Sequence, residues 1–172
     1  MAARFSLTLP RHQARLLYLA IVYHLARPGS EVDPTTLQEY EHGLTEVRVA
    51  LEPQLAGESV SLSLTPFQMA RLDSALLGII NELHMYSVFD RMAGESGRPR
   101  SLAAGFDETL KELFPEMRDD PSYASQLAED VMMLRRELAE SIKRAKEALA
   151  EEEQAAQAAR KAAKKPWQLW KR

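Results

Sequence analysis

The longest apolar pattern in the chain follows a helical period. Large hydrophobic residues and one alanine recur at steps of three and four: Leu127, Val131, Leu134, Leu138, Ile142, Ala145 and Leu149. Leu127, Leu138 and Leu149 are 11 residues apart, and an 11-residue repeat keeps an apolar stripe nearly straight. Asp120 and Pro121 precede the stripe as an N-cap residue and a first-turn proline. The pattern predicts a long C-terminal helix that starts at Asp120 and buries one face.

The character of this helix changes after Leu149. Residues 151–163 are alanine, glutamate, glutamine, arginine and lysine, which favour a helix but offer nothing large to bury. We therefore expect residues 1–150 to form one helical domain. Residues 151–172 are expected to project from it as an Ala/Glu/Lys helix with a basic, tryptophan-bearing tail.

Two short segments alternate apolar and polar residues, as strands do. Phe5–Leu9 precedes Pro10, and Val60–Leu64 precedes Thr65 and Pro66. Each then switches to helical spacing, and the two copies align at an offset of 55 in the strand and 56 in the helix. A five-residue strand is unstable alone, so the pattern predicts that the two pair as a ribbon. The alternative is that each segment runs extended across a helical body.

Further helices complete two strand–helix–helix units. Thr65, Pro66 and Gln68 predict a capped start for the helix that continues through Leu72, Leu76, Ile79, Ile80 and Leu83. Asp33 and Pro34 open a helix with apolar positions at Leu37, Tyr40, Leu44, Val47 and Leu51, and a shorter one is expected from Asp107 to Met117. The predicted fold is mainly α: a helical bundle built from two such units, with a small β ribbon, followed by the long helix.

Composition narrows the class of protein. A chain of 172 residues suits one domain without metal or disulfide support, and it contains no cysteine. The N-terminus lacks a continuous apolar stretch, so we expect no signal peptide. The longest apolar run, Leu16–Leu25, is about half as long as a segment that crosses a bilayer, so we expect it to form a buried helix instead. We expect a cytoplasmic protein, and the excess of arginine and alanine suggests a bacterial source.

Charge is divided unevenly along the chain. Residues 1–159 hold all 25 acids and 16 of the 22 bases, a charge of −9, whereas residues 160–172 carry six bases and no acid. Basic arms of this kind bind acidic proteins, nucleic acids or anionic membranes. The tail also carries Trp167 and Trp170 after Pro166. The candidate partner-binding residues are Lys161, Lys164, Lys165, Trp167, Leu169, Trp170, Lys171 and Arg172.

The tail can be interpreted in several ways. A solvated tail whose tryptophans fold back on the core of the chain is the plainest, because basic runs are common. A protein partner is the next, with nucleic acid and membrane behind it. The long stripe also allows a homodimer, because such a helix can pair with a copy of itself.

Candidate chemistry is sparse. His12, His24, His42 and His84 lack the spacing of metal ligands, and no phosphate-binding or nucleophile motif occurs. Glu39, His42 and Glu46 share a helical face, but an exposed polar face opposite the apolar positions is by far the commoner reason for such a pattern. We therefore expect no catalysis, no metal and no cofactor. The favoured function is a non-catalytic adaptor that docks a partner through its C-terminal helix and tail, and the alternative is a nucleic-acid-associated factor that uses the same tail.

Overall fold

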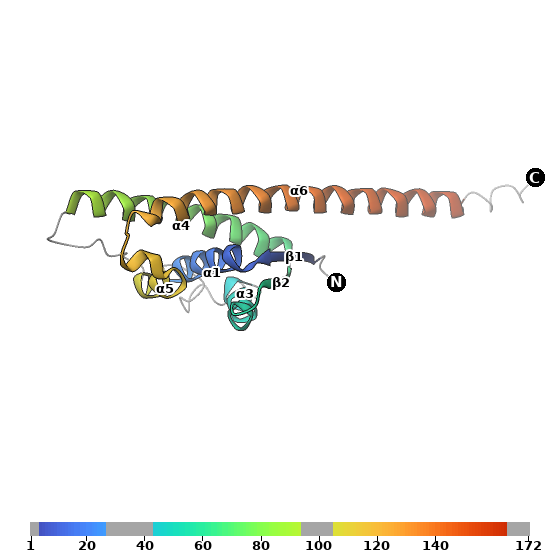
Figure 1. The fold of residues 1–172 in the computed structure, drawn as a ribbon. Helices are drawn as coiled ribbons and strands as arrows, with labels where there is room; N and C mark the ends of the chain where they lie inside the picture. Colours follow the sequence, from blue (N-terminus) through green and yellow to red (C-terminus); the bar gives the residue numbers. More distant parts are fainter. Residues whose placement is uncertain (1–3, 27–42, 94–104, 165–172) are drawn as a thin grey trace, which may run out of the picture. The chain divides into compact units, whose positions relative to one another are not determined.

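The computed structural model describes residues 4–26, 43–93 and 105–164 (Figure 1). Over these residues the chain is mainly helical, with a small two-stranded antiparallel sheet. It divides into two units, residues 1–137 and residues 138–172. We expected residues 1–150 to fold independently of residues 151–172. A division by contacts does not test independent folding, so this stays a prediction.

The first unit begins with a strand and a helix. Strand β1 spans Phe5–Pro10, and helix α1 spans Arg11–Leu25. Helix α1 contains the apolar run that we predicted to be a buried helix, and its buried residues are Ala14, Leu16, Leu17, Leu19, Ala20, Ile21 and Leu25. Because these residues occupy more than one face, α1 is covered by several elements, and it contacts α3, α4 and α5.

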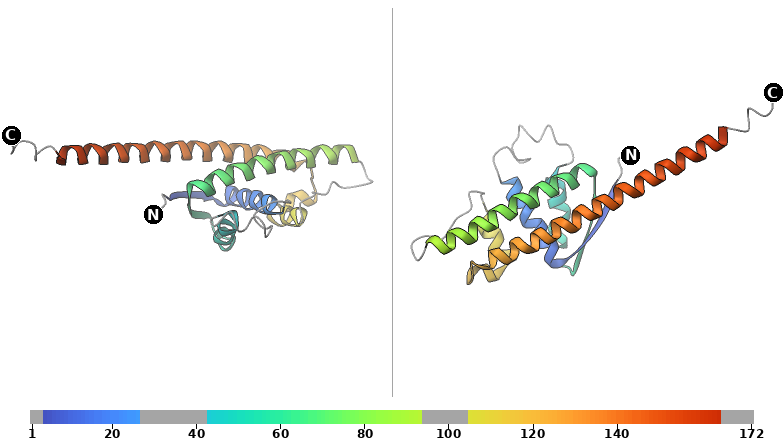
Figure 2. Two further views of the ribbon diagram at one scale, coloured as in Figure 1. Left: turned by 180° about the vertical axis from the view of Figure 1, so that it is seen from behind. Right: turned by 90° about the horizontal axis from the view of Figure 1, so that it is seen from above.

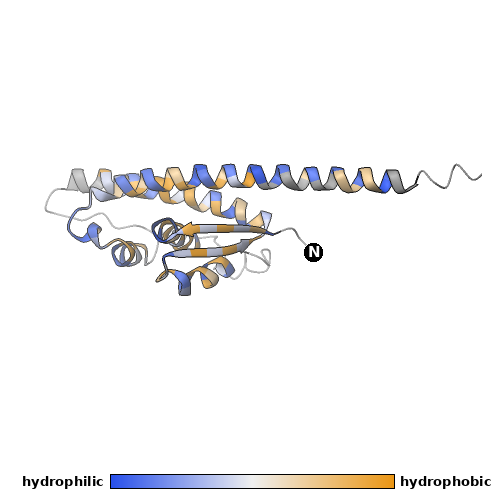
Figure 3. Ribbon diagram, turned by 45° about the vertical axis from the view of Figure 1, so that its right-hand side comes forward, coloured by the Kyte–Doolittle hydropathy of each residue, from blue (hydrophilic) through white to orange (hydrophobic). Residues whose placement is uncertain are grey.

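Strand β2, Ser59–Leu64, pairs antiparallel with β1. The register joins Phe5 to Leu64, Leu7 to Leu62 and Leu9 to Val60, which confirms that the two strands pair. Leu7, Leu9, Val60, Leu62 and Leu64 are buried, whereas the serine and threonine residues between them are exposed. Figure 3 shows this alternation of apolar and polar positions along the ribbon.

Helix α4, Pro66–Ala93, follows β2 and begins as predicted. The backbone N–H of Thr65 donates to Gln68 Oε1 at 2.9 Å, and the backbone N–H of Gln68 donates to Thr65 Oγ1 at 3.2 Å. This reciprocal pair is a capping box. The predicted apolar stripe of α4 is buried at Leu72, Leu76, Ile79, Ile80 and Leu83.

The helix expected from Asp33 to Leu51 is not continuous where the structure describes it, because Gly43 is extended (φ −82°, ψ −169°) and is the N-cap of a separate helix that begins at Leu44. Helix α3, Leu44–Leu51, buries Leu44, Val47 and Leu51, which lie at the expected positions, and continues into the 3-10 turn η1, Glu52–Gln54. Leu37 and Tyr40 lie outside the described residues.

The helix expected from Asp107 to Met117 is wrong in one respect. It divides into α5, Phe106–Leu113, and the 3-10 turn η3, Pro115–Arg118. Phe114 between them has φ −130° and ψ 81°, which is outside the helical region. A residue that precedes proline is disfavoured in helical geometry, so Pro115 accounts for the break.

Helix α6, Tyr123–Lys164, is the long C-terminal helix. It starts three residues after the predicted N-cap, because Pro121 and Ser122 form a turn. The Asp120 carboxylate accepts a hydrogen bond from the Ser122 backbone N–H at 3.0 Å, and the Ala124 N–H donates to the Pro121 carbonyl at 3.2 Å. Bonds of this short span tighten the first turn before regular α geometry begins.

Candidate interaction surface

The first part of α6 is packed within the first unit. Ala124, Leu127, Ala128, Val131 and Leu134 are all at most 1% exposed. Leu138, at the start of the second unit, is 2% exposed, and Ile142 is half-buried. The 11-residue stripe is therefore buried at its beginning, as its periodicity predicts.

Polar contacts join this part of α6 to α1 along one side. His12 Nε2 and Asp130 Oδ2 are 2.9 Å apart, and the Gln13 side-chain amide donates to Glu137 Oε2 at 2.9 Å. The His12 ring also meets the Phe114 ring edge to face, with centroids 5.7 Å apart. These contacts give His12 a structural role in joining α1 to α6.

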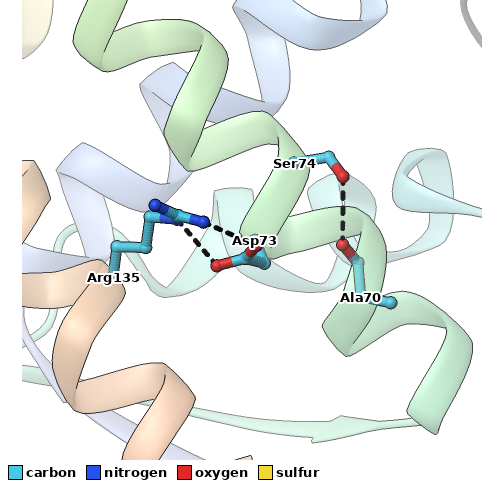
Figure 4. A network of polar contacts seen from close by, with 4 residues as sticks. All are labelled: Ala70, Asp73, Ser74 and Arg135. Atoms are coloured by element: carbon cyan, nitrogen blue, oxygen red, sulfur yellow. Dashed lines mark hydrogen bonds and ion pairs between the residues drawn. The ribbon is translucent and has the colours of Figure 1, made fainter.

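Contacts with α4 join the opposite side. Arg135 Nε donates to Asp73 Oδ1 at 2.8 Å, and Arg135 Nη2 donates to Asp73 Oδ2 at 3.0 Å (Figure 4). The hydrogen bond to Asp73 raises the pKa of Arg135. The hydroxyls of Ser87 and Ser125 are 2.7 Å apart. Figure 2 shows α4 beside the N-terminal part of α6, with the two helices running in opposite directions.

The distal part of α6 has a different surface. Every side chain from Gln154 to Lys161 is exposed. One ion pair is described nearby, between Lys143 Nζ and Glu147 Oε1 at 4.0 Å, and both side chains are more than half exposed. A solvated pair at this distance contributes little to stability. Within this stretch the helix presents small and charged side chains without burying them.

The structure reaches two of the predicted partner-binding residues. Lys161 is exposed on α6, and Lys164 is the last residue of that helix. Lys165, Trp167, Leu169, Trp170, Lys171 and Arg172 lie outside the described residues. The described part of α6 therefore leads directly into the candidate tail.

Of the three candidate acid–base residues, the structure describes only Glu46, which makes a hydrogen bond between two helices. Glu39 and His42 lie outside the described residues, while Glu46 Oε2 accepts a hydrogen bond from the Gln68 amide at 3.3 Å. His24 lies in the last turn of α1, and His84 is exposed. Across residues 4–26, 43–93 and 105–164, no group of three His, Cys, Asp or Glu side chains could hold a metal ion.

Sequence reasoning missed two surface features. The first is the set of exposed apolar side chains on α4 and α6: Phe67, Leu77, Met85, Val88, Met132 and Met133. The second is the outer edge of β2, where the Ser61 N–H donates to Gln54 Oε1 at 3.2 Å and the Ser63 carbonyl accepts from Arg4 at 2.8 Å. These side chains occupy backbone groups at the edge of β2 that a partner strand would otherwise use.

No model of a protein family matches the chain, and no curated protein or solved structure matches it either. Within the described parts of the chain, none of the helices combines the length and the apolar character needed to cross a membrane. The function must therefore be argued from the surfaces of this chain.

Proposed function

We propose that the protein is a non-catalytic adaptor that captures a protein partner through the distal part of α6 and the basic tail that follows it. The observation that carries this proposal is the contrast within α6. Its first part is buried and hydrogen-bonded, whereas its side chains from Gln154 to Lys161 are all exposed. An exposed helical stretch that is followed in the sequence by two tryptophans suits the presentation of a binding segment.

Charge supports the same proposal. Residues 138–172 hold nine bases and five acids, a net charge of +4, whereas residues 1–137 hold 13 bases and 20 acids, a net charge of −7. An acidic surface on a partner would be attracted to the second unit and repelled by the first. The tryptophans would supply the apolar anchors, because buried aromatic side chains commonly dominate binding energy.

A capture experiment with the full chain tests this proposal. W167A/W170A is expected to abolish capture at about 150 mM salt, where exposed charges are screened beyond about 8 Å. The matched control, K143Q/K146Q, removes two exposed lysines from α6 outside the tail and should capture the partner normally.

Nucleic acid binding is the alternative that the same experiment decides. Six phosphate contacts would make the logarithm of affinity fall with the logarithm of salt at a slope of about −4 to −5. Capture that survives W167A/W170A but is lost in K161Q/K164Q/K165Q/K171Q would overturn the adaptor proposal. The acidic first unit disfavours this alternative, because it repels a polyanion.

We also propose that the two strand–helix segments are an internal repeat. Leu7 and Leu62 are equivalent at the offset of 55, and they pair directly across the ribbon. The pairs on either side of this centre are related in the same way. Phe5 pairs with Leu64, and the residues equivalent to them at the offset of 55, Val60 and Leu9, also pair with each other. Such a register is what an internal twofold would require.

For five of the seven buried residues of α1, burial in the helices follows the offset of 55 rather than the offset of 56 at which the helical sequences align. Buried residues of α1 at Ala14, Leu17, Ala20, Ile21 and Leu25 correspond at 55 to buried residues of α4, namely Met69, Leu72, Ala75, Leu76 and Ile80. Alanine at Leu7 or Leu62 should then lower the free energy of unfolding by similar amounts, about 2 kcal/mol each. Urea denaturation showing costs that differ by more than about 1 kcal/mol would argue against equivalence.

A further inference from the structure

Helix α4 presents an uncharged face to solvent. Its exposed positions from residue 70 to residue 88 are alanine, serine, leucine, asparagine, histidine, methionine and valine, in that order. None is Asp, Glu, Lys or Arg, although 27% of the chain is charged and the outer face of a surface helix is normally charged or polar. Positions 70, 74, 77, 81, 84 and 88 follow steps of four and three, so they form one row along the helix. This row can contact apolar groups without desolvating a charge.

Exposed methionines of α6, which lies beside α4 (Figure 2), extend this face across the two helices. Met132 is one turn before Arg135, which pairs with Asp73 of α4. Leu77 is one turn after Asp73, and residues one turn apart share a side of a helix. Met132 and Leu77 therefore lie along the seam between α4 and α6, and because they are 43% and 45% exposed they lie on its outer side. We call the exposed apolar side chains of this surface the apolar patch: Leu77, Met85, Val88, Met132 and Met133.

The tail of the chain is complementary to the unit that carries this patch. Trp167, Leu169 and Trp170 are large apolar residues, and residues 160–172 carry six bases and no acid. Residues 1–137, which hold the patch, have a net charge of −7. Opposite net charges attract the tail to this unit, and the patch gives its indole rings apolar surface to bury.

Polar groups within the row also suit indole rings. Each indole carries one N–H donor and no acceptor, so it needs an acceptor when it is buried. Ser74 and Asn81 are exposed members of the row. The Ser74 hydroxyl donates to the Ala70 carbonyl at 3.3 Å (Figure 4), which leaves its oxygen able to accept. The face therefore combines apolar area with acceptors for the tryptophan N–H groups.

The tail is too short to reach the patch of its own chain. Helix α6 is continuous as far as Lys164, and its length from Met132 to Lys164 is about 48 Å at about 1.5 Å per residue. Fully extended, the segment from Lys164 to Trp170 spans only about 22 Å. The patch of a second copy is not subject to this restriction.

We infer that residues 165–172 of one copy bind the apolar patch on α4 and α6 of a second copy. This inference rests on the proposed function, because it uses the same tail, and it names the partner as another molecule of this chain. The stripe from Leu127 to Leu138, which the sequence offered for self-association, is buried in the single chain. Each copy carries one tail and one patch, so two copies can exchange tails in a closed dimer, or more can join in series.

Two variants of the full chain test the contact by sedimentation. L77E/M85E places charge at exposed positions of the patch, and W167A/W170A removes the apolar anchors. Each should self-associate at least about tenfold more weakly than the wild type. The matched control, V49E, places a charge at an exposed apolar position of α3 and should associate normally.

Mixing the two variants tests whether tail binds patch. The L77E/M85E chain keeps its tail and the W167A/W170A chain keeps its patch, so the mixture should form one-to-one complexes although neither variant associates alone. Binding of patch to patch would give a different result, because W167A/W170A alone would associate as tightly as the wild type.

A crosslink between chains locates the contact, because the natural chain contains no cysteine. M132C and K171C, carried by separate mass-tagged chains, should form a mixed disulfide when they are combined under mild oxidation. V49C combined with K171C should not, because Val49 is exposed on α3 outside the patch.

Circular dichroism and the thermal midpoint must show that all variants fold. The inference is overturned if the wild type stays monomeric at about 200 µM and about 150 mM salt, if W167A/W170A associates as tightly as the wild type, or if the mixed variants do not pair. A monomeric wild type that still captures another protein through its tryptophans would overturn this inference alone. If W167A/W170A impairs neither self-association nor capture, the proposed function is overturned as well.

Discussion

The pKa of Tyr18, on α1, is shifted by the groups around its hydroxyl. Burial raises its pKa above the usual value of 10.0, and the negative charge of Glu52, together with a hydrogen bond to that side chain, raises it further. Arg48 opposes these effects. The hydroxyl therefore stays protonated in the folded protein at a pH where it ionises in the unfolded chain.

The stability contributed by Tyr18 should accordingly be lost in alkali. A raised folded-state pKa means that this contribution is complete below pH 10.0 and disappears as pH rises through the higher folded value. Y18F cannot ionise at this position, so its thermal midpoint should fall less between about pH 9 and about pH 11 than that of the wild type. Equal alkaline losses in the two proteins would show that Tyr18 does not carry the effect.

At the scale of the element, α6 has one face that stabilises the fold and another that does not. Leu134 is 1% exposed and Leu138 is 2% exposed, whereas Glu140 and Arg144 are exposed. Changing either leucine to alanine should cost about 2–5 kcal/mol of unfolding free energy. E140A or R144A should cost less than about 1 kcal/mol. Urea midpoints that respond equally at all four positions would mean that this assignment of faces is wrong.

The elements that sequence predicts best are those with a strong period. The stripe of α6 and the alternation in β1 and β2 follow from residues close in the chain, because each helix or strand repeats its own geometry. Sequence placed the start of α6 three residues too early, and it did not predict the break at Phe114. Both depend on local competition: the Asp120 side chain engages Ser122, and Pro115 interrupts a helix that apolar spacing alone would continue.

Long-range contacts could not be predicted in the same way. The pair of Asp73 with Arg135 and the pair of His12 with Asp130 join residues far apart in the chain, and no local pattern specifies which polar residues will meet. The exposure of Leu77 and Met132 has the same origin, because it depends on which helix faces meet. Of the candidate tail, sequence supplies the charge and the tryptophans, while its bound form depends on a partner.

At the scale of the whole molecule, the distal part of α6 should be dispensable for stability. Truncation after Ala150 removes the exposed distal part of α6 and the tail but keeps the buried stripe through Leu138. The thermal midpoint should stay nearly unchanged. A fall of more than about 8 °C would correspond to roughly 2 kcal/mol or more for a chain of this size, and would show that the distal segment packs on the rest.

The account depends most on the contrast between the two parts of α6, and hydrogen exchange measures that contrast directly. Amides from Ala124 to Leu138 lie in the buried part of the helix, so they should exchange only when the domain opens. Amides from Glu151 to Lys161 belong to a helical stretch whose described side chains are exposed, and a short unsupported helix frays readily.

The distal amides should exchange at least about a hundredfold faster than those from Ala124 to Leu138. Equal protection along the whole of α6 would contradict the account, because it would mean that the distal helix is already packed in the single chain and presents no surface to a partner.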